Sequence, residues 1–216
     1  MPSPVSRRLL LVGAAAAPIT AAAPDIRAAA AEPKPSLVPQ FIVFTGAINN
    51  STCGNIMLRA REAVSRNPNV TLVINSYGGA VGPGIALYLY LRNLPNLNLT
   101  TYALYAVEST AVLVFLSGNT RLAHPDAHFM IHPYTRKLQG DFDFTQLNEN
   151  AYANELDTGF EEKIFRSRTS LTEAKIKQSQ RQQVYLTAGE AQKSGIISGI
   201  DDLKIPPEAY AFFIWD

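Results

Sequence analysis

Short apolar runs alternate with amphipathic segments along most of this chain, and no other feature constrains its fold as strongly. Strands are predicted at 41–44, 70–74, 99–107, 120–123 and 127–132. Helices are predicted at 52–65, 83–92, 109–116, 143–167, 171–180 and 187–194. The apolar runs have the length of buried strands, whereas the longer segments repeat apolar residues at helical spacing. Strands that alternate with helices predict an α/β domain with a mostly parallel sheet and right-handed crossover connections.

Composition narrows the class of protein. The chain has 216 residues, which suits one domain, and 47% hydrophobic with 17% charged residues is typical of a globular protein. A formal net charge of +1 gives no reason to expect a nucleic-acid partner. Cys53 is the single cysteine, so the fold cannot depend on an internal disulfide.

The N-terminal segment has the pattern of an export signal. Arg7 and Arg8 precede an apolar run, and a stretch of small residues then ends at Ala31. This order is typical of a secretory signal peptide, and the paired arginines resemble a twin-arginine signal. We therefore predict a signal peptide at 1–31, a proline-rich linker at 32–39 and a folded domain at 40–216. An exported, periplasmic protein is expected; an uncleaved anchor or a cytoplasmic protein is the alternative.

A Gly78-Gly79 turn follows the strand at 70–74 and leads into the helix at 83–92. Glycines let backbone N–H groups approach a ligand without a Cβ in the way. Those N–H groups also lie at the positive end of the helix dipole, which favours an anion or a developing oxyanion. The alternative is an ordinary strand-to-helix turn that binds nothing.

Ser109 lies where the strand at 99–107 ends and a wholly apolar helix begins. A sharp turn at this junction would present the hydroxyl as a nucleophile, with the N–H of Thr110 beside it. A serine hydroxyl is a weak nucleophile and needs a base within hydrogen-bond reach. The alternative is that Ser109 caps the helix, which is the commonest role of a serine at a helix start.

Three histidines follow at steps of four: His124, His128 and His132. On a helix this spacing would align them as metal ligands. Pro125 and the strand pattern at 127–132 argue against a helix, so no metal site is expected. His132, at the end of its strand, is a candidate base, and the alternative is a structural histidine.

The order of these features strengthens each of them. Gly78, Ser109 and His132 each follow the end of a predicted strand. Ligand groups gather at the carboxyl ends of the strands in open α/β sheets. We therefore expect the three residues to meet at one edge of the sheet.

Four segments resemble ClpP, the proteolytic subunit of Clp proteases. They are 72–79, similar to its strand and I-N-S-P-G-G turn; 108–118, similar to its nucleophile segment; 121–133, similar to its histidine segment; and 185–197, similar to its F-L-S-A-P-E-A segment. The likeness spans 41–201, nearly the whole predicted domain.

The resemblance implies a crotonase-like spiral of ββα units with a protruding helix at about 143–167, assembled into stacked homo-oligomeric rings. It implies Ser109 as the nucleophile and His132 as the general base. It also implies the backbone N–H groups of Gly78 and Thr110 as oxyanion donors, and no cofactor. The resemblance further implies a Clp-type ATPase as a partner. Export to a compartment without ATP would separate this protein from that partner.

The third catalytic position departs from the family's pattern. The family has an Asp six places before the aromatic residue of the F-L-S-A segment, and this chain has Ser179 there. Ser179 would accept a hydrogen bond from His132 without supplying charge. Replacing the acid of a serine protease costs up to ~10⁴ in turnover. The alternatives are a carboxylate from the long helix, such as Glu155 or Asp157, or a homologue without catalysis.

These features together predict a serine-type endopeptidase that cleaves peptides or unfolded proteins through an acyl-enzyme intermediate. One alternative is a catalytically weak or inactive ClpP-like ring that binds peptides. The other is an acyl-CoA enzyme of the crotonase-like fold, in which backbone N–H groups would bind a thioester carbonyl.

Overall fold

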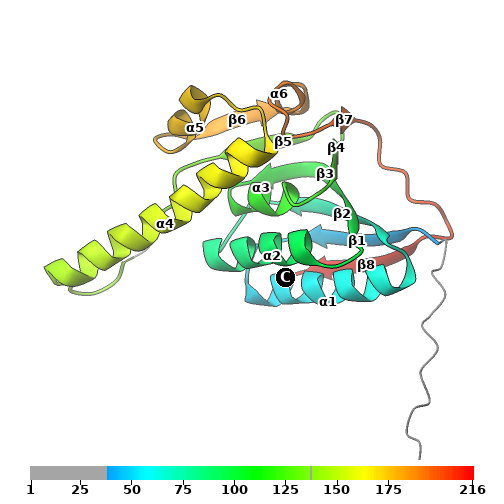
Figure 1. The fold of residues 1–216 in the computed structure, drawn as a ribbon, viewed down its shortest axis with the longest axis horizontal. Helices are drawn as coiled ribbons and strands as arrows, with labels where there is room; N and C mark the ends of the chain where they lie inside the picture. The colour runs from blue at the N-terminus through cyan, green and yellow to red at the C-terminus, as the bar shows by residue number, and fades with distance from the viewer. Residues whose placement is uncertain (1–37, 137) are drawn as a thin grey trace, which may run out of the picture. The chain divides into compact units, whose positions relative to one another are not determined.

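The computed structural model describes residues 38–136 and 138–216. The predicted signal peptide at 1–31 lies outside these residues and stays a prediction, which N-terminal sequencing of the natural protein tests. The described strands are β1 (Gln40–Thr45), β2 (Asn69–Ser76), β3 (Asn98–Glu108), β4 (Thr120–Ala123), β5 (His128–Ile131), β6 (Val184–Thr187), β7 (Gly199–Ile200) and β8 (Tyr210–Trp215). The described helices are α1 (Asn50–Arg66), α2 (Val81–Asn93), α3 (Thr110–Phe115), α4 (Phe144–Arg168), α5 (Glu173–Ser179) and α6 (Ala188–Lys193) (Figure 1).

One sheet organises the described chain. Its main path has the strand order β6-β5-β3-β2-β1-β8, and β4 joins it by pairing with β3 and β7. Every pairing between these strands is parallel except that of β5 with β6. The predicted α/β class with a mostly parallel sheet is therefore confirmed.

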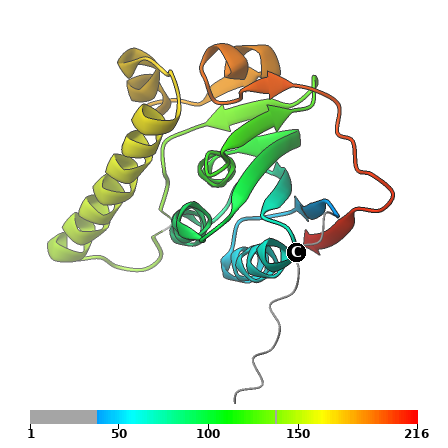
Figure 2. The ribbon, with the colours of Figure 1, turned by 45° about the vertical axis from the view of Figure 1, so that its right-hand side comes forward.

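The two faces of the sheet are covered differently. Helices α1, α2 and α3 lie against one face (Figure 2), where fully buried side chains such as Phe44 and Phe115 form the main core. The other face carries a smaller cluster made of Phe41, Val73 and Tyr102. Parallel strands that are buried on both faces carry nearly continuous apolar runs. Their positions could therefore be predicted from the sequence.

Helix α1 shows how local sequence sets an element. The Asn49 side chain accepts a hydrogen bond from the Thr52 N–H, and the Thr52 hydroxyl accepts one from the Asn49 N–H. This capping box satisfies two N–H groups that have no partner within the helix. Ile56, Ala60 and Ala63 then recur at helical spacing and are completely buried against the sheet.

Helix α4 is the predicted long helix, and part of it extends beyond the sheet (Figures 1 and 2). Asp143 and Gln146 form a capping box at its start. Near its other end, Ile164 and Phe165 are buried in the main core. None of the described helices combines the length and the apolar character that crossing a bilayer requires.

Strands β6, β7 and β8 are not predicted by the sequence pattern. β6 pairs antiparallel with β5, and β8 pairs parallel with β1, where Gln40 lies opposite Tyr210. A strand forms only beside a partner strand, and the partner of β8 lies 170 positions away in the chain. Local periodicity carries no information about such a pairing.

Candidate active site

The carboxyl ends of β2, β3 and β5 meet at one edge of the sheet. β3 pairs parallel with both β2 and β5, so the residues that follow the three strands lie side by side. These residues are the Gly78-Gly79 turn, Ser109 and His132. The structure therefore brings together the groups that the sequence placed at this edge.

Ser109 lies on a sharp turn between β3 and α3. Its φ of 53° and ψ of −130° are unusual for a residue with a side chain, and its N–H donates to the Met130 carbonyl at 2.7 Å. Such strained backbone is held in place by the surrounding structure and is concentrated at functional sites. The side chain makes no capping hydrogen bond to α3. The N-cap alternative is therefore wrong.

The Ser109 hydroxyl and the His132 imidazole form a pair that we call the dyad. Ser109 Oγ lies 2.8 Å from His132 Nε2, and His132 Nδ1 lies 2.7 Å from the Pro133 carbonyl oxygen. Since a carbonyl can only accept, the proton is on Nδ1 and the Nε2 lone pair faces the hydroxyl. This is the tautomer that a general base needs. Both side chains are partly exposed and accessible to substrate.

The Gly78-Gly79 turn runs against the nucleophile. Gly78 has a φ of +94°, and a Cβ added there would lie 2.6 Å from Ser109 Cβ and 2.8 Å from the Glu108 carbonyl oxygen. Only glycine permits this close approach. The Gly78 N–H donates to Ser76 Oγ at 3.1 Å. The Thr110 N–H lies in the first turn of α3, where N–H groups have no partner within the helix.

Ser179 does not contact the dyad. It is buried at the end of α5, and its hydroxyl donates to the Ile176 carbonyl at 2.8 Å. The predicted hydrogen bond to His132 is absent, because the Pro133 carbonyl takes that place. Ser179 faces its own helix because a serine hydroxyl near a helix end readily bonds back to a carbonyl three or four residues earlier.

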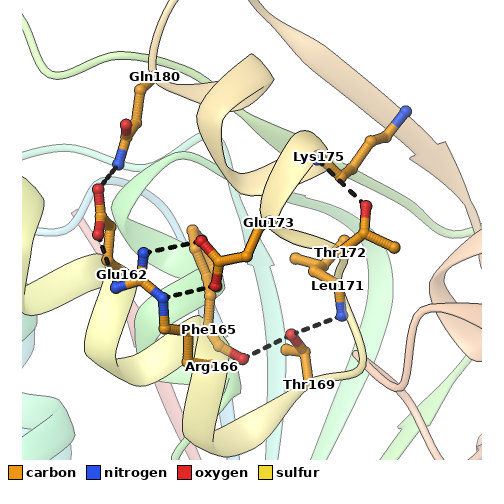
Figure 3. Close-up of polar contacts among 9 residues, drawn as sticks. All are labelled: Glu162, Phe165, Arg166, Thr169, Leu171, Thr172, Glu173, Lys175 and Gln180. Carbon is orange, nitrogen blue, oxygen red and sulfur yellow. Dashed lines mark hydrogen bonds and ion pairs between the residues drawn. The ribbon is translucent and has the colours of Figure 1, made fainter.

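A polar cluster fixes the helix that carries Ser179 (Figure 3). Arg166 of α4 pairs with Glu173 of α5 at 2.7 Å and with Glu162 at 2.6 Å. Gln180, just after α5, donates to the same Glu162 carboxylate. These contacts are at least partly exposed and individually weak, but together they tie both ends of α5 to α4.

The acids considered as substitutes for the missing Asp lie elsewhere. Glu155 is exposed on α4, and Asp157 accepts from Arg136 at 2.7 Å. Neither makes a hydrogen bond to His132 in the described structure. The third group at the dyad is therefore a backbone carbonyl.

The other two histidines have separate partners. His128 Nε2 lies 2.9 Å from Glu108 Oε1, and the His128 ring meets the Tyr105 ring edge to face. His124 lies 3.7 Å from an Asp126 carboxylate oxygen, near the surface. The three histidines do not converge, and no group of three metal-ligating side chains occurs in residues 38–136 and 138–216.

A cleft that the sequence did not indicate opens beside the dyad. It has a volume of about 410 Å³ and is lined by 81–82, 134–136, Asn154 and Asp157. The first two segments begin two positions after Gly79 and two positions after His132. Asn154 and Asp157 of α4 reach the cleft only through tertiary packing.

Glu161 is buried, at 4% exposure, and its carboxyl contacts the Tyr134 hydroxyl, whose residue lines this cleft. The pKa of its carboxyl is raised to about 8, mainly by burial and to a smaller extent by the neighbouring Glu162 charge, while the hydrogen bond with the Tyr134 hydroxyl opposes the rise. The carboxyl is therefore largely protonated at pH 7. Burying it neutral is far less costly than burying it charged.

The raised pKa of Glu161 predicts that stability falls as pH rises. The unfolded chain releases this proton near pH 4.5 and the folded chain near pH 8, so the free energy of unfolding decreases across that window by about 1.4 kcal/mol per pH unit. Glu161→Gln is expected to remove this slope. Urea denaturation at pH 5.5 and pH 8 measures it, and the exposed Glu155→Gln on the same helix is the control. Parallel pH profiles for wild type and Glu161→Gln would contradict the assignment.

Comparisons with known proteins extend over most of the chain. The sequence matches the Clp protease family over residues 33–203. The ATP-dependent Clp protease proteolytic subunit of Cyanophora paradoxa is 25% identical over 167 residues, covering 74% of this chain and 84% of that protein. The proteolytic subunit 1 of Bacillus cereus is 26% identical over 175 residues, covering 78% and 88%. The proteolytic subunit 2 of Corynebacterium glutamicum is 27% identical over 180 residues, covering 79% and 86%.

Proposed function

The chain belongs to the Clp protease family, and from that membership we propose that it is a serine-type endopeptidase with Ser109 as nucleophile and His132 as general base. The observation that carries the proposal is the 2.8 Å contact between Ser109 Oγ and His132 Nε2, in the tautomer fixed by the Pro133 carbonyl. The substrates are peptides or unfolded chains, whose backbones can reach a partly exposed serine.

The chemistry follows from this geometry. Ser109 Oγ attacks the substrate carbonyl carbon while His132 Nε2 takes the hydroxyl proton. The oxyanion receives the Thr110 N–H and the Gly78 N–H, which exchanges its hydrogen bond with Ser76 for one with the substrate. His132 then gives its proton to the leaving amine, and the C–N bond breaks. Water, deprotonated by His132, hydrolyses the acyl-enzyme and restores the serine.

The missing carboxylate affects the rate. The Pro133 carbonyl holds His132 in the correct tautomer, but it carries only a partial charge and stabilises the imidazolium less than an Asp does. We therefore expect a slower enzyme than one with a complete triad. The Ser179 hydroxyl contributes no charge and bonds to its own helix.

The names of the relatives describe subunits of ATP-dependent proteases. We propose by analogy that this chain forms homo-oligomeric rings, which light scattering of the purified protein tests. If the protein stays in a compartment that contains ATP, we also propose a Clp-type ATPase as its partner.

Labelling with a fluorophosphonate probe tests the function directly. The probe's phosphorus forms a bond to an activated serine oxygen and releases fluoride. We expect mass spectrometry to place the adduct on Ser109 of the folded protein, and heat-denatured protein to remain unlabelled. A correctly folded, unlabelled wild type would favour a non-catalytic peptide-binding ring. Tight binding of coenzyme A would instead favour an acyl-CoA enzyme.

A further inference from the structure

The third group at the dyad belongs to a loop that has little backbone support. The Pro133 carbonyl accepts from His132 Nδ1, and residues 132–136 lie outside every helix and strand. Apart from that bond, the backbone of 133–136 makes no hydrogen bond to another part of the described chain. A backbone carbonyl is only as well placed as the loop that carries it. Side chains must therefore hold this loop in position.

Two side chains of the loop contact α4. The hydroxyl of Tyr134, the residue after Pro133, forms a hydrogen bond with the Glu161 carboxyl. Arg136 Nη2 lies 2.7 Å from Asp157 Oδ2. Asp157 and Glu161 are four positions apart and therefore lie on the same face of α4. The loop is thus joined to one helix face at two points, directly after the Pro133 carbonyl.

The two contacts differ in strength. The side chains of Arg136 and Asp157 are 40% and 27% exposed, so solvent and salt weaken their attraction. Tyr134 packs against the main core and Glu161 is buried, where a hydrogen bond is stronger than it is in water. The contact between Tyr134 and Glu161 is therefore the firmer of the two.

Both partners of this firmer contact are uncharged at pH 7. Burial, and after it the neighbouring Glu161 carboxyl, raises the pKa of the Tyr134 hydroxyl, which therefore keeps its proton. The raised pKa of Glu161 keeps its carboxyl largely protonated. Glu161 lies in a fixed part of α4, because the Phe160 ring meets the Tyr88 ring of α2 edge to face and Ile164 is buried in the main core. The loop is thus joined to a rigid support by a bond that salt does not screen.

We propose that Tyr134 and Glu161 are positioning residues for the catalytic base: their hydrogen bond keeps the Pro133 carbonyl against Nδ1 of the imidazole. The inference rests on the proposed peptidase function and adds two residues to it. The ion pair between the loop and α4 supports the same arrangement more weakly. Without the buried bond the carbonyl leaves Nδ1 more readily, the proton moves to Nε2, and the nucleophile loses its proton acceptor.

Tyr134→Phe tests the proposal on the purified full chain at pH 7, because it removes the hydroxyl and keeps the ring against the core. We expect kcat for a fluorogenic peptide to fall by about tenfold while KM changes by less than about twofold, since a misplaced base costs rate and not binding. Glu161→Leu is expected to have the same effect. Glu161→Gln keeps an oxygen that accepts from Tyr134, and we expect its kcat to stay within about threefold of wild type.

Tyr152→Phe is the matched control. Tyr152 lies on α4 and is 61% exposed, so the loss of its hydroxyl is expected to leave kcat unchanged. The double variant with Tyr134→Phe and Glu161→Leu is expected to lose no more than either single variant, because each change removes the same bond.

Nitrogen NMR of isotope-labelled histidines tests the geometry without any substrate. It shows which ring nitrogen carries the proton, and the His132→Ala variant identifies the His132 signals by their absence. We expect neutral His132 in the wild type to carry its proton on Nδ1. In Tyr134→Phe we expect a second fraction with the proton on Nε2.

These measurements separate the positioning role from the peptidase function. A folded Tyr134→Phe protein with the wild-type tautomer and the wild-type kcat overturns the positioning role alone, and so does a loss confined to KM. A Glu161→Gln protein as slow as Glu161→Leu also overturns it. A wild type that has the Nδ1 tautomer but neither reacts with fluorophosphonate nor cleaves peptides overturns the peptidase function instead. Circular dichroism establishes folding, and if Glu161→Leu does not fold, Tyr134→Phe and Glu161→Gln decide the question.

Discussion

The Ser109→Ala variant is expected to lose at least about 10⁴-fold in kcat/KM for a cleaved peptide, because the atom that would form the acyl-enzyme is removed. The backbone donors and the cleft remain, so substrate still binds and the loss falls on kcat. His132→Ala is expected to cost a similar factor. The double variant is expected to lose no more than either single one, since the two groups act as a unit. Steady-state cleavage of a fluorogenic peptide measures all three.

Ser179→Ala is the matched control for this series. The Ser179 hydroxyl donates to the Ile176 carbonyl and does not contact the dyad, so its removal is expected to leave kcat/KM within a few-fold of wild type. Equal losses in Ser179→Ala and Ser109→Ala would show that the third position takes part in catalysis. A Ser109→Ala variant that cleaves at the wild-type rate would remove the peptidase assignment.

The central part of the fold was predictable because its strands are buried on both faces. Strands β1, β2 and β3 are short apolar runs bounded by turn residues, and they lie within two residues of their predicted ends. β6 and β8 were missed because each depends on a distant partner. In β8, Phe213 and Trp215 are largely exposed while Phe212 and Ile214 are buried. That alternation becomes meaningful only once β1 is known to lie beside it.

The dyad was predictable in its members but not in its geometry. The positions of Ser109 and His132 after successive parallel strands implied a common edge. The positive φ of Ser109 could not be read from the sequence, because serine normally avoids that region and is common at helix starts as a cap. The Pro133 carbonyl as the partner of Nδ1 has no sequence signal, since any residue offers a carbonyl.

The cleft could not be predicted from the sequence, because its lining comes from segments that are distant in the chain. Asn154 and Asp157 lie on a helix more than twenty positions after His132 in the chain, and their approach to the dyad depends on how α4 packs. From the sequence alone, Asp157 was a candidate substitute for the missing catalytic acid. The structure gives it Arg136 as a partner instead, at 2.7 Å.

Gly78→Ala is expected to lower kcat/KM by about 10² to 10³-fold although it replaces neither residue of the dyad. The new Cβ would lie 2.6 Å from Ser109 Cβ and 2.8 Å from the Glu108 carbonyl oxygen, which are closer than atoms can pack. The φ of +94° adds strain for alanine. The turn or the serine must shift, and a displacement of about 1 Å at reacting groups costs about 10²-fold. Peptide cleavage and the rate of fluorophosphonate labelling measure the loss.

Gly54→Ala separates this effect from a general cost of replacing glycine. Gly54 lies on α1 with no atoms within 4 Å of an added Cβ, so alanine is expected to raise the free energy of unfolding by about 0.5–1 kcal/mol and leave activity unchanged. Circular dichroism at the assay temperature establishes that Gly78→Ala is folded when its rate is measured. A folded Gly78→Ala protein that labels and cleaves like wild type would mean that the glycine turn does not position the nucleophile, and the proposed oxyanion contact at Gly78 would have to be abandoned with it.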